Sequence, residues 1–175
     1  LQGVAGMIPQ PEGWLRRVAE IVRGHGAQLI ADEVMTGFGR TGFPISTLSS
    51  QLSTPLFAGQ QEGVQPDFLV LAKGLTGGYL PMAATLTTQA VFDVFLGEYE
   101  EFKTFFHGHS FTANQLGAAA ALASLEILHS PASIRARTNL ERILHEELKS
   151  LWSLPNVGDV RQVGLVAGIE LVKDW

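Results

Sequence analysis

Three polar side chains stand at the ends of apolar stretches in the first half of this sequence. Asp32 and Glu33 follow the run "AQLIA", and Lys73 ends the run "DFLVLA". A carboxylate at such a position can bind a metal, pair with a cationic ring nitrogen or act as a base. A lysine held in a cleft can lose its charge and become a nucleophile that forms Schiff bases. The alternatives are a solvated strand end for the acidic pair and a surface position for Lys73.

The segments that carry these residues are predicted to be strands of one sheet. Residues 27–31, 67–72 and 82–88 read as strands, and the first two are apolar apart from Gln28 and Asp67, as strands covered on both faces are. Helices predicted over 11–26 and 113–128 accompany them, which indicates an α/β fold with a parallel-type sheet. The second helix is apolar almost all round and is therefore expected to be buried. Ligands of such sheets bind at the carboxyl ends of the strands, so Asp32 and Lys73 are expected to reach one ligand from two strands. A Schiff-base lysine and a carboxylate that faces a pyridinium nitrogen are the partners that pyridoxal 5′-phosphate (PLP) requires.

The motif "GFGRTG" (37–42) matches the dinucleotide-binding pattern and gives an alternative function, an NAD-dependent dehydrogenase. Its surroundings favour a glycine-rich turn instead. Asp32 and Glu33 lie between the strand and the glycines, where their charge repels a pyrophosphate, and no helical period follows. We therefore interpret this motif, including Arg40, as structural.

The stretch before the helix predicted over 113–128 carries histidines and hydroxyl groups. His107 and His109 alternate as a metal pair could, but no third ligand is evident nearby, so no metal site is expected. Ser110 and Thr112 precede the helix, where hydroxyl and backbone N–H groups form an anion site. The same residues, or Asn114, could simply cap the helix.

Composition excludes several classes of partner. The net charge is −5 without a basic tract, which argues against nucleic acid, and the absence of cysteine excludes disulfides and thiolate metal sites. No apolar run is long enough to span a membrane and no signal peptide is visible, so a cytoplasmic location is expected. The sequence lacks an initial Met and stops as a strand ends, which suggests an internal fragment of a longer protein.

The chain resembles the class III PLP-dependent aminotransferases in three stretches, "LIADEVMTGFGRTG", "PDFLVLAKGLTGGYLPMAATLTT" and "TFFHGHSFTANQLGAAAALASL". The resemblance implies the fold type I of PLP-dependent transferases. Within the class, "LTGGYLPMAATLTT" and "FFHGHSFTANQLG" favour the subfamily that converts 8-amino-7-oxononanoate to 7,8-diaminononanoate in biotin biosynthesis. Its amino donor is S-adenosylmethionine or lysine. Another class III enzyme, acting on ornithine, 4-aminobutyrate or a similar ω-amine, is the alternative.

The resemblance also implies a role for each matching residue. Asp32 would hold the protonated pyridine nitrogen, and Lys73 would carry PLP as a Schiff base and then move the proton during transamination. Ser110 stands where the family binds the cofactor phosphate of the neighbouring subunit, which implies a homodimer. Gly108 would meet the substrate carboxylate with its backbone. His109 stands where many members have proline.

The chain departs from the family pattern in several places. Residues 43–55 read as a loop insertion of roughly a dozen residues after "GRTG". The upstream phosphate loop, the aromatic that stacks on the ring and the downstream arginine for the substrate carboxylate are missing, so the fragment alone is expected to be inactive. We expect residues 1–130 to be part of the large PLP-binding domain and residues 131–175 to begin the small C-terminal domain.

Overall fold

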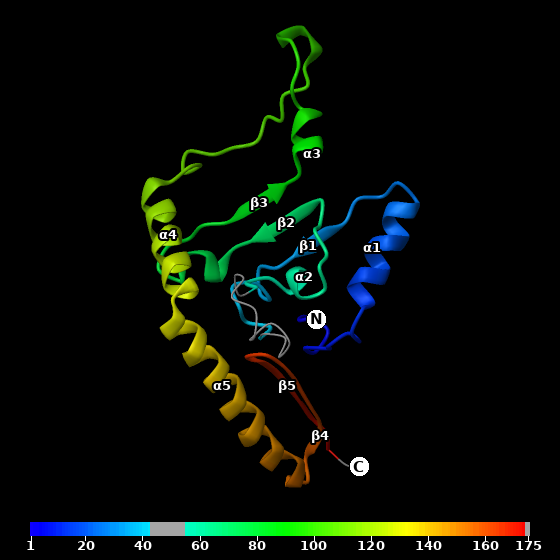
Figure 1. Cartoon of the computed structure of the whole chain (residues 1–175), viewed down its shortest axis with the longest axis vertical. Coiled ribbons are helices and arrows are strands. Elements are labelled where there is room, and N and C mark those ends of the chain that lie inside the picture. Colours follow the sequence, from blue (N-terminus) through cyan, green and yellow to red (C-terminus); the bar gives the residue numbers. More distant parts are fainter. Residues whose placement is uncertain (43–54, 174–175) are drawn as a thin grey trace.

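A computed structural model describes residues 1–42 and 55–173 of the chain (Figure 1). The helices are α1 (Trp14–Gly24), α2 (Ala58–Gln61), α3 (Gln89–Asp93), α4 (Gln115–His129) and α5 (Pro131–Lys149). The strands are β1 (Ile30–Asp32), β2 (Phe68–Leu71), β3 (Ala84–Thr87), β4 (Val157–Val163) and β5 (Val166–Leu171). The short 3-10 helices are η2 (Lys73–Thr76), η3 (Tyr99–Glu101) and η4 (Ser150–Ser153). The expected insertion lies almost wholly outside the described residues.

The first three strands form one mixed sheet in the order β1-β2-β3. β1 and β2 run parallel, with Ala31 opposite Leu69, as the sequence predicts. β3 runs antiparallel to β2, with Leu86 opposite Leu69, so the expectation of a parallel sheet is wrong for this strand. The physical reason is the connection: no crossover helix lies between β2 and β3, and the chain reverses through η2 instead.

The sheet is not covered on both faces by the described residues, contrary to the expectation from its apolar strands. Ile30 in β1 is 64% exposed and Leu86 in β3 is 52% exposed. The core that does form has two parts. One packs Phe38, Leu71 and Leu75 against α4, and the other packs α1 against residues next to β1 and β2.

Side-chain caps fix where the two long helices begin. Asn114 accepts hydrogen bonds from the backbone N–H groups of Leu116 and Gly117, so Asn114 caps α4. Ser130 accepts a hydrogen bond from Ser133 N and starts α5 immediately after α4 ends. α4 is apolar on most of its surface, yet only Gly117 and Ala121 are buried, so the prediction of a buried helix holds for one face alone.

The C-terminal hairpin of β4 and β5 packs back on the first part of the chain. Leu165 N donates to the carbonyl of Arg40 at 2.8 Å, which joins the hairpin turn to the GFGRTG turn. Arg161 in β4 donates to the carbonyl of Gly6 at 2.9 Å. The hydrogen bonds from Arg161 to Glu170 and Asp159 raise the pKa of the guanidinium, so this tether stays charged at all ordinary pH values.

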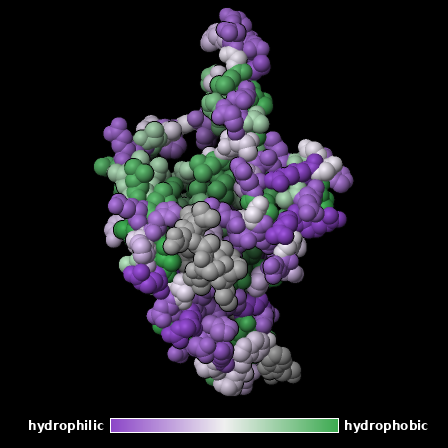
Figure 2. Space-filling view, in the orientation of Figure 1, coloured by the Kyte–Doolittle hydropathy of each residue, from purple (hydrophilic) through white to green (hydrophobic). Residues whose placement is uncertain are grey.

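The segment between β3 and α4 projects away from the rest of the molecule through α3 and η3 (Figure 1). Every residue from 92 to 116 is exposed, and apolar residues gather along α3 and over α4 (Figure 2). Exposed aromatic side chains along this projection include Phe92, Tyr99, Phe105 and Phe111. None of the described helices combines the length and the apolar character needed to cross a membrane.

Candidate active site

Asp32 and Lys73 lie at the same edge of the sheet. The parallel register places Asp32 opposite Val70, and Glu33 N donates to the carbonyl of Val70 at 3.0 Å. Lys73 follows three residues after Val70, at the start of η2. Both side chains therefore stand at the carboxyl ends of adjacent parallel strands, where α/β sheets bind ligands.

The backbone of Lys73 has an unusual conformation. Its φ angle is 46°, in the left-handed region that side chains with a Cβ rarely adopt. Such a conformation costs of order 1–3 kcal/mol and is retained mainly at functional sites. The side chain is exposed, and none of the ion pairs between described residues includes it. The chain thus holds a lysine in a strained position with its amino group available.

Asp32 ends β1 and Glu33 follows it, and the two side chains have different surroundings. Asp32 is exposed, and its Oδ1 accepts one hydrogen bond, from Val34 N at 3.0 Å. Glu33 is 3% exposed. Its carboxylate accepts from Thr36 Oγ1 at 2.8 Å, Ala58 N at 3.0 Å and Gly59 N at 2.9 Å. Asp32 is therefore the exposed carboxylate at this strand end, and Glu33 is a buried carboxylate that holds the start of α2.

Replacing Glu33 by Ala is expected to lower the free energy of unfolding by about 3 kcal/mol, because the backbone N–H groups of Ala58 and Gly59 lose the carboxylate that accepts from them in a largely buried place. Urea denaturation of the natural protein that contains this chain measures the loss. The matched control is Glu20→Ala, which removes an exposed carboxylate from α1 and should change stability by about 0.5 kcal/mol or less. Equal effects of the two substitutions would show that the Glu33 network is not structural.

The side chains at this edge of the sheet are of the kinds that can bind PLP. A carboxylate suits a protonated ring nitrogen, and an exposed lysine amino group suits a covalent link to an aldehyde. Asp32 and Lys73 supply these groups from neighbouring strands. The described residues contain no cluster of three or more His, Asp or Glu side chains placed to hold a metal.

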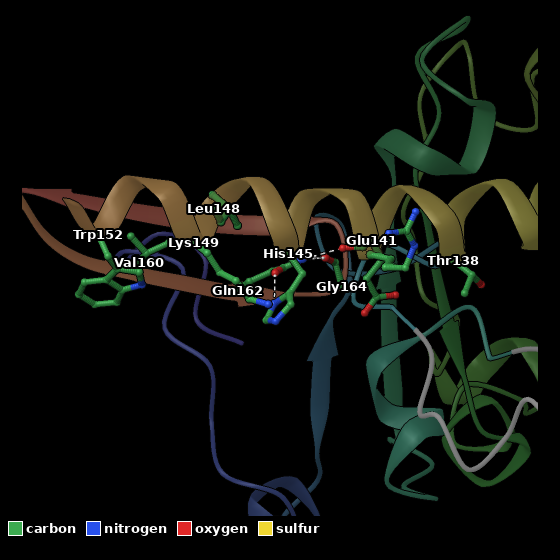
Figure 3. Close-up of a pocket in the computed structure, with 10 residues that line it drawn as sticks. Thr138, Glu141, His145, Leu148, Lys149, Trp152, Val160, Gln162 and Gly164 are labelled. Atoms are coloured by element: carbon green, nitrogen blue, oxygen red, sulfur yellow. Dashed lines mark hydrogen bonds between the residues drawn. The ribbon is translucent and has the colours of Figure 1, made fainter. Parts of the chain in front are cut away.

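A separate hollow lies between α5 and the β4–β5 hairpin (Figure 3). Its volume is about 590 Å³, and the residues that line it include Glu141, His145 and Gln162. The His145 ring nitrogen Nδ1 and Gln162 Oε1 are 3.1 Å apart. None of the residues that line this hollow is a candidate from the sequence, and it lies in a different part of the fold from Asp32 and Lys73.

The sequence pattern of the family described as "Aminotransferase class-III" matches residues 1–175. The chain belongs to the class III aminotransferases. The fold expected from the sequence, the α/β fold type I of PLP-dependent transferases, is confirmed by the solved structures of this class.

Relatives of this class III aminotransferase share its sequence over nearly the whole chain. An adenosylmethionine-8-amino-7-oxononanoate aminotransferase of Geobacter sulfurreducens is 51% identical over 99% of this chain and 36% of its own length. The enzyme of the same name from Aquifex aeolicus is 48% identical over the same shares. The crystal structure of that enzyme from Methanocaldococcus jannaschii has a TM-score of 0.82 and 47% identity, over 97% of this chain and 37% of that one. The chain therefore spans about a third of the length of these relatives.

Ser110 and Gly108 are not brought to Asp32 and Lys73 by the described residues of this class III chain. Both are exposed in the stretch that returns from the projection to α4, and the hydrogen bonds in this stretch are local. His109 N, for example, donates to Thr112 Oγ1 at 2.8 Å. Thr112 and Ser110 do not cap α4, since Asn114 does. The roles of Ser110 and Gly108 remain predictions from the resemblance.

Two residues that the sequence analysis did not single out hold the turn after Lys73. Ser124 in α4 donates from Oγ to the carbonyl of Gly74 at 3.1 Å. Thr76 is 2% exposed and donates from Oγ1 to the carbonyl of Leu80 at 2.6 Å. In the sequence, Ser124 and Thr76 are each a hydroxyl residue within a largely apolar stretch. Such residues are also common at purely structural positions, so the sequence did not single them out.

Proposed function

We propose that the protein containing this chain is a PLP-dependent aminotransferase that converts 8-amino-7-oxononanoate to 7,8-diaminononanoate in biotin biosynthesis. The proposal rests mainly on the positions of Asp32 and Lys73, which follow the adjacent parallel strands β1 and β2 at the same edge of the sheet. The choice of substrate is supported by relatives at 46–51% identity that are named adenosylmethionine-8-amino-7-oxononanoate aminotransferase. The amino donor is S-adenosylmethionine or lysine.

Each proposed role follows from the chemistry of a side chain. PLP, when bound, supplies an electron sink for the charge that develops at the substrate Cα. The Asp32 carboxylate holds the ring nitrogen in its protonated form through a charge-assisted hydrogen bond. Lys73 Nζ would hold the cofactor covalently, and as a free amine it would take the proton from the substrate Cα and deliver it during the exchange.

We further propose that Ser110 binds the phosphate of the cofactor in the partner subunit of a homodimer, with Gly108 near the substrate carboxylate. The exposure of the whole stretch 92–116 supports a role outside the fold of its own chain. The apolar residues Phe92, Phe105 and Phe111 are 52%, 65% and 76% exposed, as suits a surface that packs on a second copy. We also propose a cytoplasmic enzyme in which residues 1–130 belong to the large domain and residues 131–175 begin the small one.

Substrate profiling tests the proposed reaction. The natural protein, supplied with PLP, should transfer an amino group to 8-amino-7-oxononanoate from S-adenosylmethionine or lysine, with ping-pong kinetics. The comparison set is ornithine and 4-aminobutyrate as donors with a 2-oxo acid as acceptor. A higher kcat/KM with either of these donors would assign the protein to the alternative, another class III ω-aminotransferase.

A further inference from the structure

We propose that Phe38, in the middle of the GFGRTG turn, is a positioning residue for Lys73. This inference rests on the proposed function, because it gives Lys73 a task that depends on its position. The inference gives the GFGRTG turn a role in the site, although none of its residues takes part in the proposed chemistry. The side chain of Phe38 fills the space directly beside Gly74, the residue that follows Lys73.

The Phe38 side chain leaves no room for a side chain at position 74. A Cβ atom placed on Gly74 would lie 2.8 Å from Phe38 Cδ2 and 2.9 Å from Phe38 Cβ and Cγ. Gly74 is not among the glycines with a left-handed φ angle, so its backbone does not require glycine. The requirement comes from the Phe38 side chain, which needs the space that any other residue at position 74 would occupy.

Phe38 is itself held firmly from several directions. It is 5% exposed and has a left-handed φ angle of 62°. Its ring makes an edge-to-face contact with Phe57, with centroids 5.4 Å apart. The next residue, Gly39, donates its N–H to the carbonyl of Leu56 at 2.8 Å. The turn can therefore act as a fixed support, since its position is set by the α2 region and by the core.

The turn after Lys73 is held from the opposite direction by α4 and by its own hydrogen bonds. Ser124 donates to the carbonyl of Gly74, and Leu75 N donates to the carbonyl of Ala72 at 3.0 Å. Lys73 thus lies between two fixed peptide units while its own side chain makes no ion pair among the described residues. The backbone on either side of Lys73 determines where its amino group lies, and the Phe38 side chain limits the positions that this backbone can take.

The first test disturbs this contact from both sides. Gly74→Ala places a methyl group against Phe38, and Phe38→Leu removes the ring that limits the turn. In the natural protein with PLP, Gly74→Ala should slow formation of the borohydride-trappable adduct on Lys73 by about 10²-fold, as expected for a small misplacement of a reacting group. Phe38→Leu should slow it by at least about tenfold for the same reason. Normal adduct formation in either variant would overturn the proposal.

A second measurement needs no cofactor. Phe38→Leu keeps an apolar side chain but loses the ring, and it should accelerate hydrogen exchange at Leu75 N and Gly77 N, whose hydrogen bonds close the turn. Leu148→Ala, a buried position in α5, is the control for general loss of stability and should leave both adduct formation and this exchange unchanged. Equal exchange in Phe38→Leu and Leu148→Ala would contradict the proposal. If the wild-type protein forms no adduct on Lys73, the proposed function fails instead, while the exchange result still decides whether Phe38 holds the turn.

Discussion

Replacing Lys73 by Arg in the natural protein is expected to lower kcat for transamination by about 10⁴-fold, the upper range for removal of a general acid–base group. The guanidinium keeps the positive charge and most of the length of the side chain. It stays protonated at all ordinary pH values, so it can neither form a Schiff base nor accept a proton from the substrate Cα. Single-turnover kinetics with PLP-loaded protein measure the loss.

The matched control is Lys149→Arg. Lys149 forms an exposed ion pair with Glu146 at 3.1 Å. Arginine can form the same pair, so this variant should keep wild-type kcat. Near-normal turnover in the Lys73→Arg variant would remove Lys73 from the mechanism.

Replacing Asp32 by Asn is expected to weaken PLP binding by about 10- to 100-fold, the equivalent of one hydrogen bond to a charged group. The shape of the side chain is retained, and its carbonyl oxygen can still accept from Val34 N. The lost negative charge no longer favours the protonated ring nitrogen, so kcat should fall as well. Equilibrium titration of the apoprotein with PLP measures the affinity.

Glu20→Gln serves as the control for this change, because Glu20 is an exposed carboxylate in α1 that pairs with Arg17 at 3.0 Å. It removes the same charge at a position outside the candidate site and should leave PLP affinity unchanged. Equal affinity in the wild-type and Asp32→Asn proteins would mean that the carboxylate does not face the cofactor.

The strand ends that carry Asp32 and Lys73 were predictable from sequence because the apolar runs before them are short, continuous and bounded by polar residues. The left-handed conformation of Lys73 was not predictable. No local rule favours a lysine there, and the turn is held by contacts from Ser124 and Phe38, which are distant in sequence. The same limit applies to Glu33, whose partners Ala58 and Gly59 lie beyond the 43–54 segment.

Hydrophobicity alone gave wrong predictions of how far the sheet and α4 are buried. Apolar strands predicted cover on both faces, and an apolar helix predicted burial all round, but Ile30, Leu86 and Leu122 are all more than half exposed. Apolar residues indicate that a surface tends to be buried, but they do not indicate which other segment or chain covers it. The chain spans about a third of its relatives, and a chain of that extent supplies only some of those contacts.

Borohydride reduction of the natural protein with PLP, followed by peptide mapping, tests the central claim most directly. The account predicts a phosphopyridoxyl label on Lys73, because among the lysines of this chain it is the one that follows β2 at the same sheet edge as Asp32. A label spread over Lys103, Lys149 and Lys173, or no label at all, would contradict it.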